Sequence, residues 1–470
     1  MAPFTPTPRE ICLLTVLLVL LLVFTVNLPQ DTRTLKDIVR PYTVYEDADV
    51  HAEPPTFEKQ LTLQTLNLPL RWDTGPVPQT KIVAHAPGWS IIDRLYMLNG
   101  TVYIVSDEPE TIPDCRRIAS TAVFIENGPI AETERIPTDK DMRVINTEEA
   151  KRLFGTDATR LDGVTWYAND PKQFITHYYH WSAELFFVAK RHFHPKKDDF
   201  PHLDANNWRD YAAMNQWVLR ASFPSISTEF MNDFKERADT GRVFVFDRVV
   251  FADRAAAMHG ENFLRTQRTA ANAFALPGSV NWWSTIRNNV VGFAGLGESG
   301  GAESVQGVDS VPVITYISRQ DWGRRMLVPE DHDRLVRELY NLRDTYGYEV
   351  NVVSMDRLSR IEQFQLAGRT TIMMGVHGNG LTSLLWMRPT PRSTVMEFFY
   401  PEGFAHDYEY TTRALGMVHF GFWNDRAFTR PDVPPVNYPE GFQGNSIPID
   451  GAAVARLCHQ RLTLSDEADD

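Results

Sequence analysis

The sequence predicts an α/β protein whose C-terminal half is built on a parallel β-sheet. From residue 311 to residue 423, apolar stretches typical of strands alternate with helical segments. A glycine-rich stretch, residues 295–310, separates this region from an earlier one with shorter strand-like stretches. With 470 residues and 43% hydrophobic side chains, the chain is long enough for two such domains.

Each expected element of the C-terminal sheet follows from its hydrophobic periodicity. Strands are expected at residues 311–319, 348–355, 370–376, 393–399 and 417–423. Helices are expected at residues 329–347, 356–369, 380–387 and 408–416. This alternation implies right-handed crossovers with helices on both faces, and ligands of such sheets bind beyond the carboxyl ends of the strands.

The same patterns divide the rest of the chain. A first domain is expected at residues 82–294, in which residues 101–106 and 121–126 are predicted strands. The linker follows, and a second domain is expected at residues 311–430. Residues 431–470 form a C-terminal segment that ends in an acidic tail.

An uncharged stretch near the N-terminus predicts a membrane anchor. Residues 11–28 carry no charge over 18 residues, enough for a helix to span a hydrocarbon layer about 30 Å thick. The alternative is a cleaved signal peptide, whose apolar region is shorter, about 7 to 15 residues. Residues 1–10 would be a cytoplasmic tail, and residues 29–81, rich in proline, threonine and acidic side chains, a solvated stem.

Two features bear on the orientation of this anchor and disagree. Arg33, Lys36 and Arg40 follow the span, and the positive-inside tendency alone would place the long part of the chain in the cytoplasm. Asn99 begins an N-x-[ST] sequon without proline, which functions as an N-glycosylation site only in the secretory lumen. The residues alone leave the orientation open.

Composition excludes some classes of partner. The formal net charge of -13 argues against a general affinity for nucleic acid. Cys115 and Cys458 are left either as a disulfide or as two free buried thiols.

Metal binding is not expected. No histidine and cysteine cluster suggests zinc. The acidic pairs Asp47 with Asp49 and Asp139 with Asp141 have the D-x-D form, but neither follows an apolar strand that would present it to a metal-bound diphosphate.

The segment GVHGNG, residues 375–380, lies where an expected strand ends and a helix begins. Backbone amides at a helix start attract anions, and glycine lets a phosphate approach them. Gly378 and Gly380 would allow that approach, and His377 could donate to the same phosphate. The spacing is not the G-x-G-x-x-G dinucleotide fingerprint, and a tight turn without a ligand is the alternative.

Charged residues follow two other strands of this sheet. Glu397 lies near the end of the strand at residues 393–399, where a carboxylate often meets ribose hydroxyls. Arg319 and Arg324 follow the first strand and could neutralise a diphosphate, whereas Arg325 is expected to be an ordinary surface arginine.

In the first domain, His180 and Glu184 are four residues apart and therefore share a helix face. Such a pair could act as a general base. An exposed histidine–glutamate pair on an amphipathic helix is the alternative reading of the same spacing.

These segments together resemble glycosyltransferase family 61, which includes plant xylosyl- and arabinosyltransferases and animal protein O-linked N-acetylglucosaminyltransferases. The resemblance rests on HWSAE (180–184), ISRQDWGRR (317–325), IEQF (361–364), GVHGNGLTSLLWM (375–387) and STVMEFF (393–399). Asn379 and Ser383 depart from the family pattern, which usually has alanine and asparagine at these positions.

The resemblance implies a GT-B fold, with two Rossmann-like domains and a cleft between them. It implies an inverting enzyme that uses a UDP-sugar, xylose or N-acetylglucosamine foremost, without an essential metal or other cofactor. The acceptor would be a glycan or glycoprotein, and the enzyme a single-pass type II membrane protein of the Golgi or endoplasmic reticulum with its catalytic part in the lumen.

Carried over by residue, the resemblance places His377, Gly378, Asn379 and Gly380 against the diphosphate. A separate set completes the site: Glu397 on the ribose, Arg319 and Arg324 on the leaving nucleotide, Glu184 as base and His180 as its partner.

Two alternatives stay open at the level of sequence. The first is a membrane-anchored binding protein that has lost catalysis, which the departures at Asn379 and Ser383 suggest. The second, a metal-dependent transferase with a D-x-D pair, is disfavoured by the positions of those pairs.

Overall fold

The structure, a computed structural model, describes residues 69–126, 129–186, 208–273, 282–296 and 311–464. The predicted tail, membrane anchor and most of the stem lie outside the described residues, as does most of the predicted linker. In the part that is described, no helix has the length and apolar character needed to cross a membrane.

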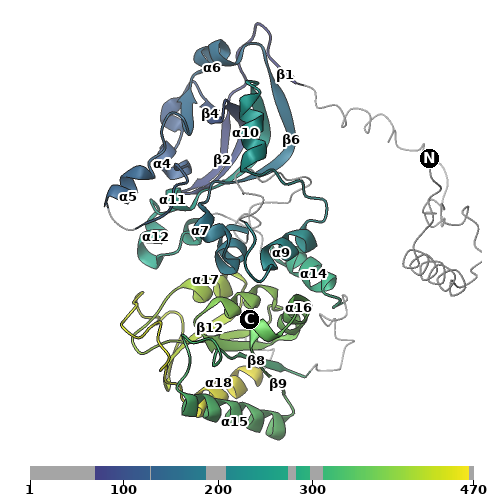
Figure 1. The fold of residues 1–470 in the computed structure, drawn as a ribbon, viewed down its shortest axis with the longest axis vertical. Coiled ribbons are helices and arrows are strands. Elements are labelled where there is room, and N and C mark those ends of the chain that lie inside the picture. The colour runs from purple at the N-terminus through teal and green to yellow at the C-terminus, as the bar shows by residue number, and fades with distance from the viewer. Residues whose placement is uncertain (1–68, 127–128, 187–207, 274–281, 297–310, 465–470) are drawn as a thin grey trace, which may run out of the picture. The chain divides into compact units, whose positions relative to one another are not determined.

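A seven-stranded mixed sheet forms the first half of the fold (Figure 1). Its strands are β1 (Leu70–Arg71), β2 (Lys81–Ala86), β3 (Trp89–Leu98), β4 (Thr101–Val105), β5 (Met142–Ile145), β6 (Asp157–Ala168) and β7 (Phe244–Ala252). The order is β1-β6-β7-β3-β4-β5, with β2 paired to β3. Residues 69–81, predicted as the end of the stem, are already part of this fold, where Trp72 and Val77 are buried.

This first sheet is not the parallel, Rossmann-like sheet that we expected. Only β4–β5 and β6–β7 are parallel, while β2–β3, β3–β4, β3–β7 and β1–β6 are antiparallel. The reason is local: β3 and β4 are joined by Asn99 and Gly100, both with positive φ, and such a two-residue turn produces a hairpin. Asn99 is exposed at this turn, and its glycosylation stays a prediction.

The predicted strand at residues 101–106 is confirmed as β4, but the one at residues 121–126 is wrong. That segment has no paired strand and runs over the surface, with Phe124 60% exposed. The helices of this half are α4 (Cys115–Ile118), α5 (Pro129–Glu134), α6 (Thr147–Phe154), α7 (Lys172–Ile175), α9 (Met214–Ser222), α10 (Met231–Asp239), α11 (Arg254–Ala257), α12 (Glu261–Thr266), α13 (Ala270–Ala273) and α14 (Ser284–Phe293), with η1 (Pro109–Thr111) and the π-helix η2 (His180–Phe186).

The second sheet matches its prediction closely. Its order is β13-β12-β11-β10-β8-β9, and all pairs are parallel except β12–β13. The strands are β8 (Val313–Ile317), β9 (Glu349–Val353), β10 (Ile372–Val376), β11 (Thr394–Phe398), β12 (Val418–Trp423) and the additional β13 (Arg426–Phe428). The helices are α15 (Pro329–Tyr346), α16 (Arg360–Arg369), α17 (Asp407–Ala414) and α18 (Gly451–Leu462), with the 3₁₀ helices η4 (Met355–Arg357) and η5 (Asn379–Trp386).

Successive residues of β10 face opposite sides of this sheet, as strand geometry requires. Met374 belongs to the hydrophobic cluster with residues of α15 and α18, and Met373 to the cluster with residues of α16, α17 and η5. Figure 1 shows α15 and α18 on one side of the sheet and α16 and α17 on the other. Every nonpolar residue of the strand is therefore buried, which explains why its sequence is a continuous apolar run rather than an alternating one.

The largest hydrophobic core joins the two sheets. Trp386 of η5 donates a hydrogen bond from Nε1 to the hydroxyl of Tyr178 at 2.8 Å, and Trp283 donates to the carbonyl of Leu385 at 2.7 Å. The described residues consequently form one compact unit. The disulfide alternative is wrong, since Cys115 and Cys458 are both free.

Candidate active site

The strand order places a ligand-binding edge between β8 and β10. From β8 the chain moves to β9 on one side, and then to β10, β11 and β12 on the other. Adjacent loops leave such a switch point in opposite directions, and the crevice between them is where open α/β sheets bind ligands. Arg319 follows β8 and residues 377–380 follow β10, so the structure brings these predicted donor-binding residues together.

Two contacts fix the loops at this edge. A Cβ atom placed on Gly378 would lie 2.9 Å from Nη1 of Arg319, so only glycine allows the guanidinium group to lie where it does. Arg325 donates from Nη1 to the carbonyl of His377 at 3.3 Å. Arg325, which we expected to be an ordinary surface residue, therefore belongs to the site.

Between these loops is a cavity of about 360 Å³, here called the switch-point cavity. Its lining includes Arg319, Arg324, Arg325, Asn379 and Gly380. Three guanidinium groups thus face one cavity, and Asp356 is the single acid among its described lining residues. The arrangement suits an anion with several oxygens, because guanidinium groups bind phosphate oxygens in pairs.

Arg319 is held ready for such a ligand. Burial, together with the neighbouring charge of Arg325, lowers the pKa of its guanidinium group, although the group stays protonated. Within the described residues, its buried Nε has no hydrogen-bond acceptor. A buried donor without an acceptor is costly, and a bound anion would remove that cost.

Asn379 begins η5, and its side-chain oxygen accepts a hydrogen bond from the hydroxyl of Thr382 at 3.2 Å. This bond gives the asparagine a local role in shaping the first turn, where the family pattern has a small residue. Gly380 lies against β8, since a Cβ there would stand 2.9 Å from Cγ2 of Ile317.

Glu397 does not line the switch-point cavity. It is fully buried, and its carboxylate oxygens accept hydrogen bonds from Nδ1 of His377 at 2.5 Å and from Nε2 of His419 at 2.8 Å. The predicted contact with a ribose is therefore not possible in this conformation, because both oxygens are occupied and none of the carboxylate is accessible. Glu397 instead fixes the ring of His377 beside the glycines.

The second predicted pair lies in a network of charges, in which Glu184 is buried and His180 is partly buried. Nδ1 of His180 lies 2.6 Å from Oε2 of Glu184, and the carboxylate also accepts hydrogen bonds from Arg254 and Arg268. Glu184 is only 2% exposed, so the alternative of an exposed pair is wrong. These residues are on η2, a π-helix, a form that often marks functional sites.

The network orients His180. A carboxylate between two guanidinium groups is ionised and can only accept, so Nδ1 of His180 donates and Nε2 carries the lone pair. Burial, reinforced by the charges of Arg254 and Arg268, lowers the pKa of His180 to about 3, and the ring is neutral near pH 7.

Further partners of this network are distant in sequence, and no spacing pattern could have shown them. Arg254 donates from Nε to Asp170 at 3.1 Å, and Arg268 donates from Nη1 to Asp407 of α17 at 2.7 Å. The network therefore reaches from the first sheet to a helix that covers the second one. Among the described residues, no group of acids, histidines and cysteines is arranged to hold a metal ion.

One family model covers most residues of this site. Residues 178–396 match the family model Glycosyltransferase 61, a range that includes η2, Arg319 and the segment 377–380. No curated protein sequence matches the chain. Among solved structures, the chain is similar to a dodecameric iron-containing heptosyltransferase, TibC, crystallised with ADP-D-β-D-heptose.

That likeness has 11% identity, covers 66% of this chain and 79% of the other, and has a TM-score of 0.30, which is too low to inform the function. The family match is the informative comparison. Residues 178–396 match the glycosyltransferase 61 model, and the protein is a glycosyltransferase.

Proposed function

We propose that the protein transfers a sugar from a nucleotide diphosphate sugar, specifically a UDP-sugar, to a glycan or glycoprotein, with inversion at the anomeric carbon. The observation that carries this proposal is the set of three arginines around the switch-point cavity. Such a set matches the diphosphate of the donor, the one strongly anionic part of a nucleotide sugar.

The arginines would act mainly on the leaving group. When the bond between the anomeric carbon and the diphosphate oxygen breaks, negative charge grows on the nucleotide, and guanidinium groups already in place stabilise it. Arg319 and Arg324 fill this role, with Arg325 added by the structure. A divalent metal is then not required, and undiminished turnover in a chelator would be the result expected.

His180 is the better candidate for the base than Glu184, whose oxygens are all engaged by His180 and two arginines. In this scheme the acceptor hydroxyl gives its proton to Nε2 of His180 as its oxygen bonds to the anomeric carbon. Glu184 holds the ring, and its negative charge offsets part of the cost that burial and the two arginines place on the imidazolium. The ring of His177, which lines the switch-point cavity, lies 4.8 Å from that of His180.

The transferred sugar is proposed to be xylose or N-acetylglucosamine, and the location a Golgi or endoplasmic reticulum membrane with the catalytic part in the lumen. Asn379 and Ser383, which depart from the family pattern, both line the switch-point cavity. This observation keeps a second candidate, a protein that binds the donor without transferring sugar.

A turnover assay separates the two candidates. The full chain is incubated with each UDP-sugar and a broad glycan array, and transfer is measured by mass spectrometry. Transfer from one donor supports the proposed enzyme. Calorimetric binding of a donor without any transfer supports the binding protein.

A further inference from the structure

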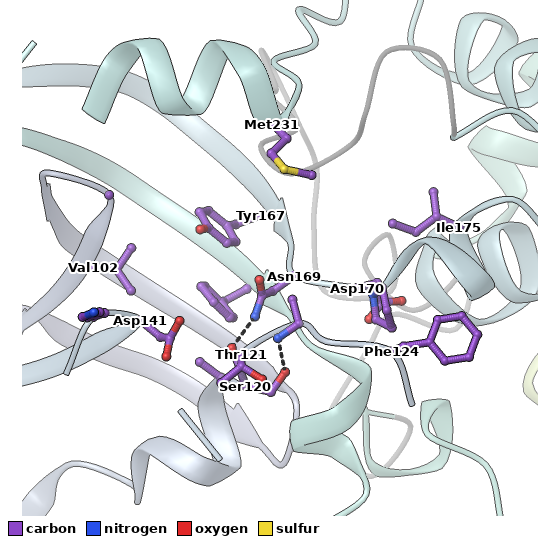
Figure 2. Close-up of a pocket in the computed structure, with 16 residues that line it drawn as sticks. Val102, Ser120, Thr121, Phe124, Asp141, Tyr167, Asn169, Asp170, Ile175 and Met231 are labelled. Atoms are coloured by element: carbon purple, nitrogen blue, oxygen red, sulfur yellow. Dashed lines mark hydrogen bonds between the residues drawn. The ribbon is translucent and has the colours of Figure 1, made fainter. Parts of the chain in front are cut away.

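A second cavity, of about 500 Å³, lies over one face of the first sheet, and we call it the sheet-face cavity. Val102 of β4 and Tyr167 of β6 line one side, while Phe124 and Ile175 lie opposite them, as Figure 2 shows. None of these residues belongs to the switch-point cavity.

The segment that carries Phe124 is held by hydrogen bonds at Ser120 and at Ile125. Ser120 donates from its backbone N–H to Asp253 at 2.6 Å, and its hydroxyl contacts the same carboxylate at 2.9 Å. Ile125 exchanges two hydrogen bonds with the side chain of Gln173, at 2.8 and 3.0 Å. Phe124 is nevertheless 60% exposed between these anchors, so an aromatic ring is held out at the cavity by a fixed segment.

The polar groups around this cavity differ from those of the switch-point cavity. Its described lining has Lys140 as the one cation, beside Asp141, Asp170 and Asn169. Asp170 is paired with Arg254, so Lys140 and Asp141 leave the lining without an excess of positive charge, and an anionic ligand is not favoured. A neutral molecule with an apolar face and several hydroxyl groups fits an aromatic ring flanked by carboxylate and amide groups.

Asn169 is positioned for such a ligand. Its side-chain nitrogen donates to the carbonyl of Ser120 at 2.9 Å, as Figure 2 shows, and to Asp253 at 2.7 Å, so the orientation of the amide is fixed. Both N–H groups of the amide donate to these two acceptors, so the amide oxygen is the atom that can accept a hydrogen bond from a ligand hydroxyl.

Side-chain contacts connect both cavities to the network around the proposed base. Asp170, which lines the sheet-face cavity, contacts Arg254, and Arg254 contacts Glu184. On the other side, His177 lines the switch-point cavity beside His180. The sheet-face cavity is therefore linked by side-chain contacts to the network that holds the proposed base.

We propose that the sheet-face cavity binds a sugar unit of the acceptor, with its apolar face against Phe124 and its hydroxyls on Asn169 and Asp141. The assignment of this sugar to the acceptor rests on the proposed transferase function. If this cavity binds a sugar unit, the acceptor is a carbohydrate chain rather than a bare peptide.

The test is a titration of the full chain with methyl glycosides of xylose, galactose, mannose and N-acetylglucosamine, followed by saturation-transfer NMR. We expect at least one glycoside to bind, and Phe124→Ala to weaken its binding about tenfold, as the loss of an aromatic contact would. Val123→Ala is the matched control, because Val123 is a neighbour 40% exposed that does not line the cavity. Arg319→Met should leave glycoside binding unchanged.

The outcomes separate this proposal from the proposed function. If no glycoside binds, or if Phe124→Ala and Val123→Ala both bind as the unaltered chain does, the sheet-face cavity is not a sugar site. If glycosides bind there but no UDP-sugar binds anywhere, the proposed donor is wrong and the sugar site stands.

Discussion

The guanidinium group of Arg319 lies directly over the backbone of Gly378, at a distance that leaves no room for a side chain at position 378. One residue follows β8 and the other follows β10, so this contact joins the two loops of the switch point. It explains in physical terms why glycine stands after His377: the arginine needs the space that a Cβ would take.

Gly378→Ala should therefore displace Arg319 and weaken the binding of a nucleotide sugar. The added methyl group would stand 2.9 Å from Nη1, which is closer than van der Waals contact allows, so the guanidinium group has to move. We expect a loss of about 10-fold in affinity, from one charge-assisted hydrogen bond worth about 1.5 kcal/mol. Calorimetry measures this affinity.

Gly292→Ala is the control for that substitution. No atom lies within 4 Å of a Cβ built on Gly292, in helix α14, and donor binding should stay as it was. Equal affinities for Gly378→Ala and Gly292→Ala would show that the position of Arg319 does not matter for the donor.

His180→Gln should abolish turnover and leave the donor affinity intact. Glutamine keeps a hydrogen bond to Glu184 but cannot take up a proton, and a positioned general base contributes about 100-fold to 10,000-fold. His332→Gln, on α15, is the control and should turn over normally. The measurement is the rate of sugar transfer at saturating donor. If this rate falls by less than about 10-fold in His180→Gln, His180 is not the base.

Glu184→Gln should act differently, by destabilising the fold. Neutralising this carboxylate leaves Arg254 and Arg268 buried without their shared partner, and breaking a buried ion pair costs about 3 to 5 kcal/mol. Chemical denaturation gives the free energy of unfolding. Glu148→Gln, which removes an exposed pair with Arg152, should cost under about 1 kcal/mol, and an equal cost for both would contradict the role of the network.

Thermal stability should fall as the pH is lowered from 7.5 to 5. Burial lowers the pKa of His85 and of His177 to about 4, with smaller contributions from Arg117 and His180, and the pKa of His180 is about 3. Below their ordinary value of 6.5 the unfolded chain takes up these protons and the folded chain does not, so unfolding becomes more favourable.

Asp253 has the opposite effect on the pH dependence of stability. Burial raises its pKa to about 6, so the folded state binds a proton between about pH 6 and 4 that the unfolded state does not, and stability is gained there as the pH falls. Burial also lowers the pKa of His259 and His332 and raises that of Asp210, so five histidines outweigh two aspartates. Scanning calorimetry at both pH values should show a lower Tm at pH 5. The difference between the two Tm values should be smaller in His85→Leu. A higher Tm at pH 5 would contradict the predicted loss of stability.

The second sheet was predictable from the sequence because each of its elements is specified locally. The buried strands are continuous apolar runs, and α15 carries Leu335, Leu339 and Leu342 along one face. The first sheet was not, since its antiparallel pairs depend on hairpins, and residues 121–126 have strand-like composition without a partner strand. The sequence shows the composition and the hydrophobic period of a segment. Whether the segment pairs as a strand depends on which other strands lie beside it in the fold.

The same distinction holds for the site. Arg319, His377 and Gly380 were predictable because the loops after parallel strands meet at one edge. The partners of Glu184 were not, because Arg268 and Asp407 come from distant parts of the chain and carry no shared motif. The burial of Glu397 was missed for the same reason, since His419 is supplied by the neighbouring strand β12.

The central claim is that the switch-point cavity binds the diphosphate of a nucleotide sugar through Arg319. Isothermal titration calorimetry of the full chain against a panel of UDP-sugars tests it most directly, with Arg319→Met beside Arg357→Met, a substitution of an arginine whose side chain is 70% exposed. We expect that one UDP-sugar binds, that Arg319→Met weakens its binding by about 10-fold to 100-fold, and that Arg357→Met leaves its binding unchanged. Binding by none of the panel, or equal binding by both variants, would contradict it.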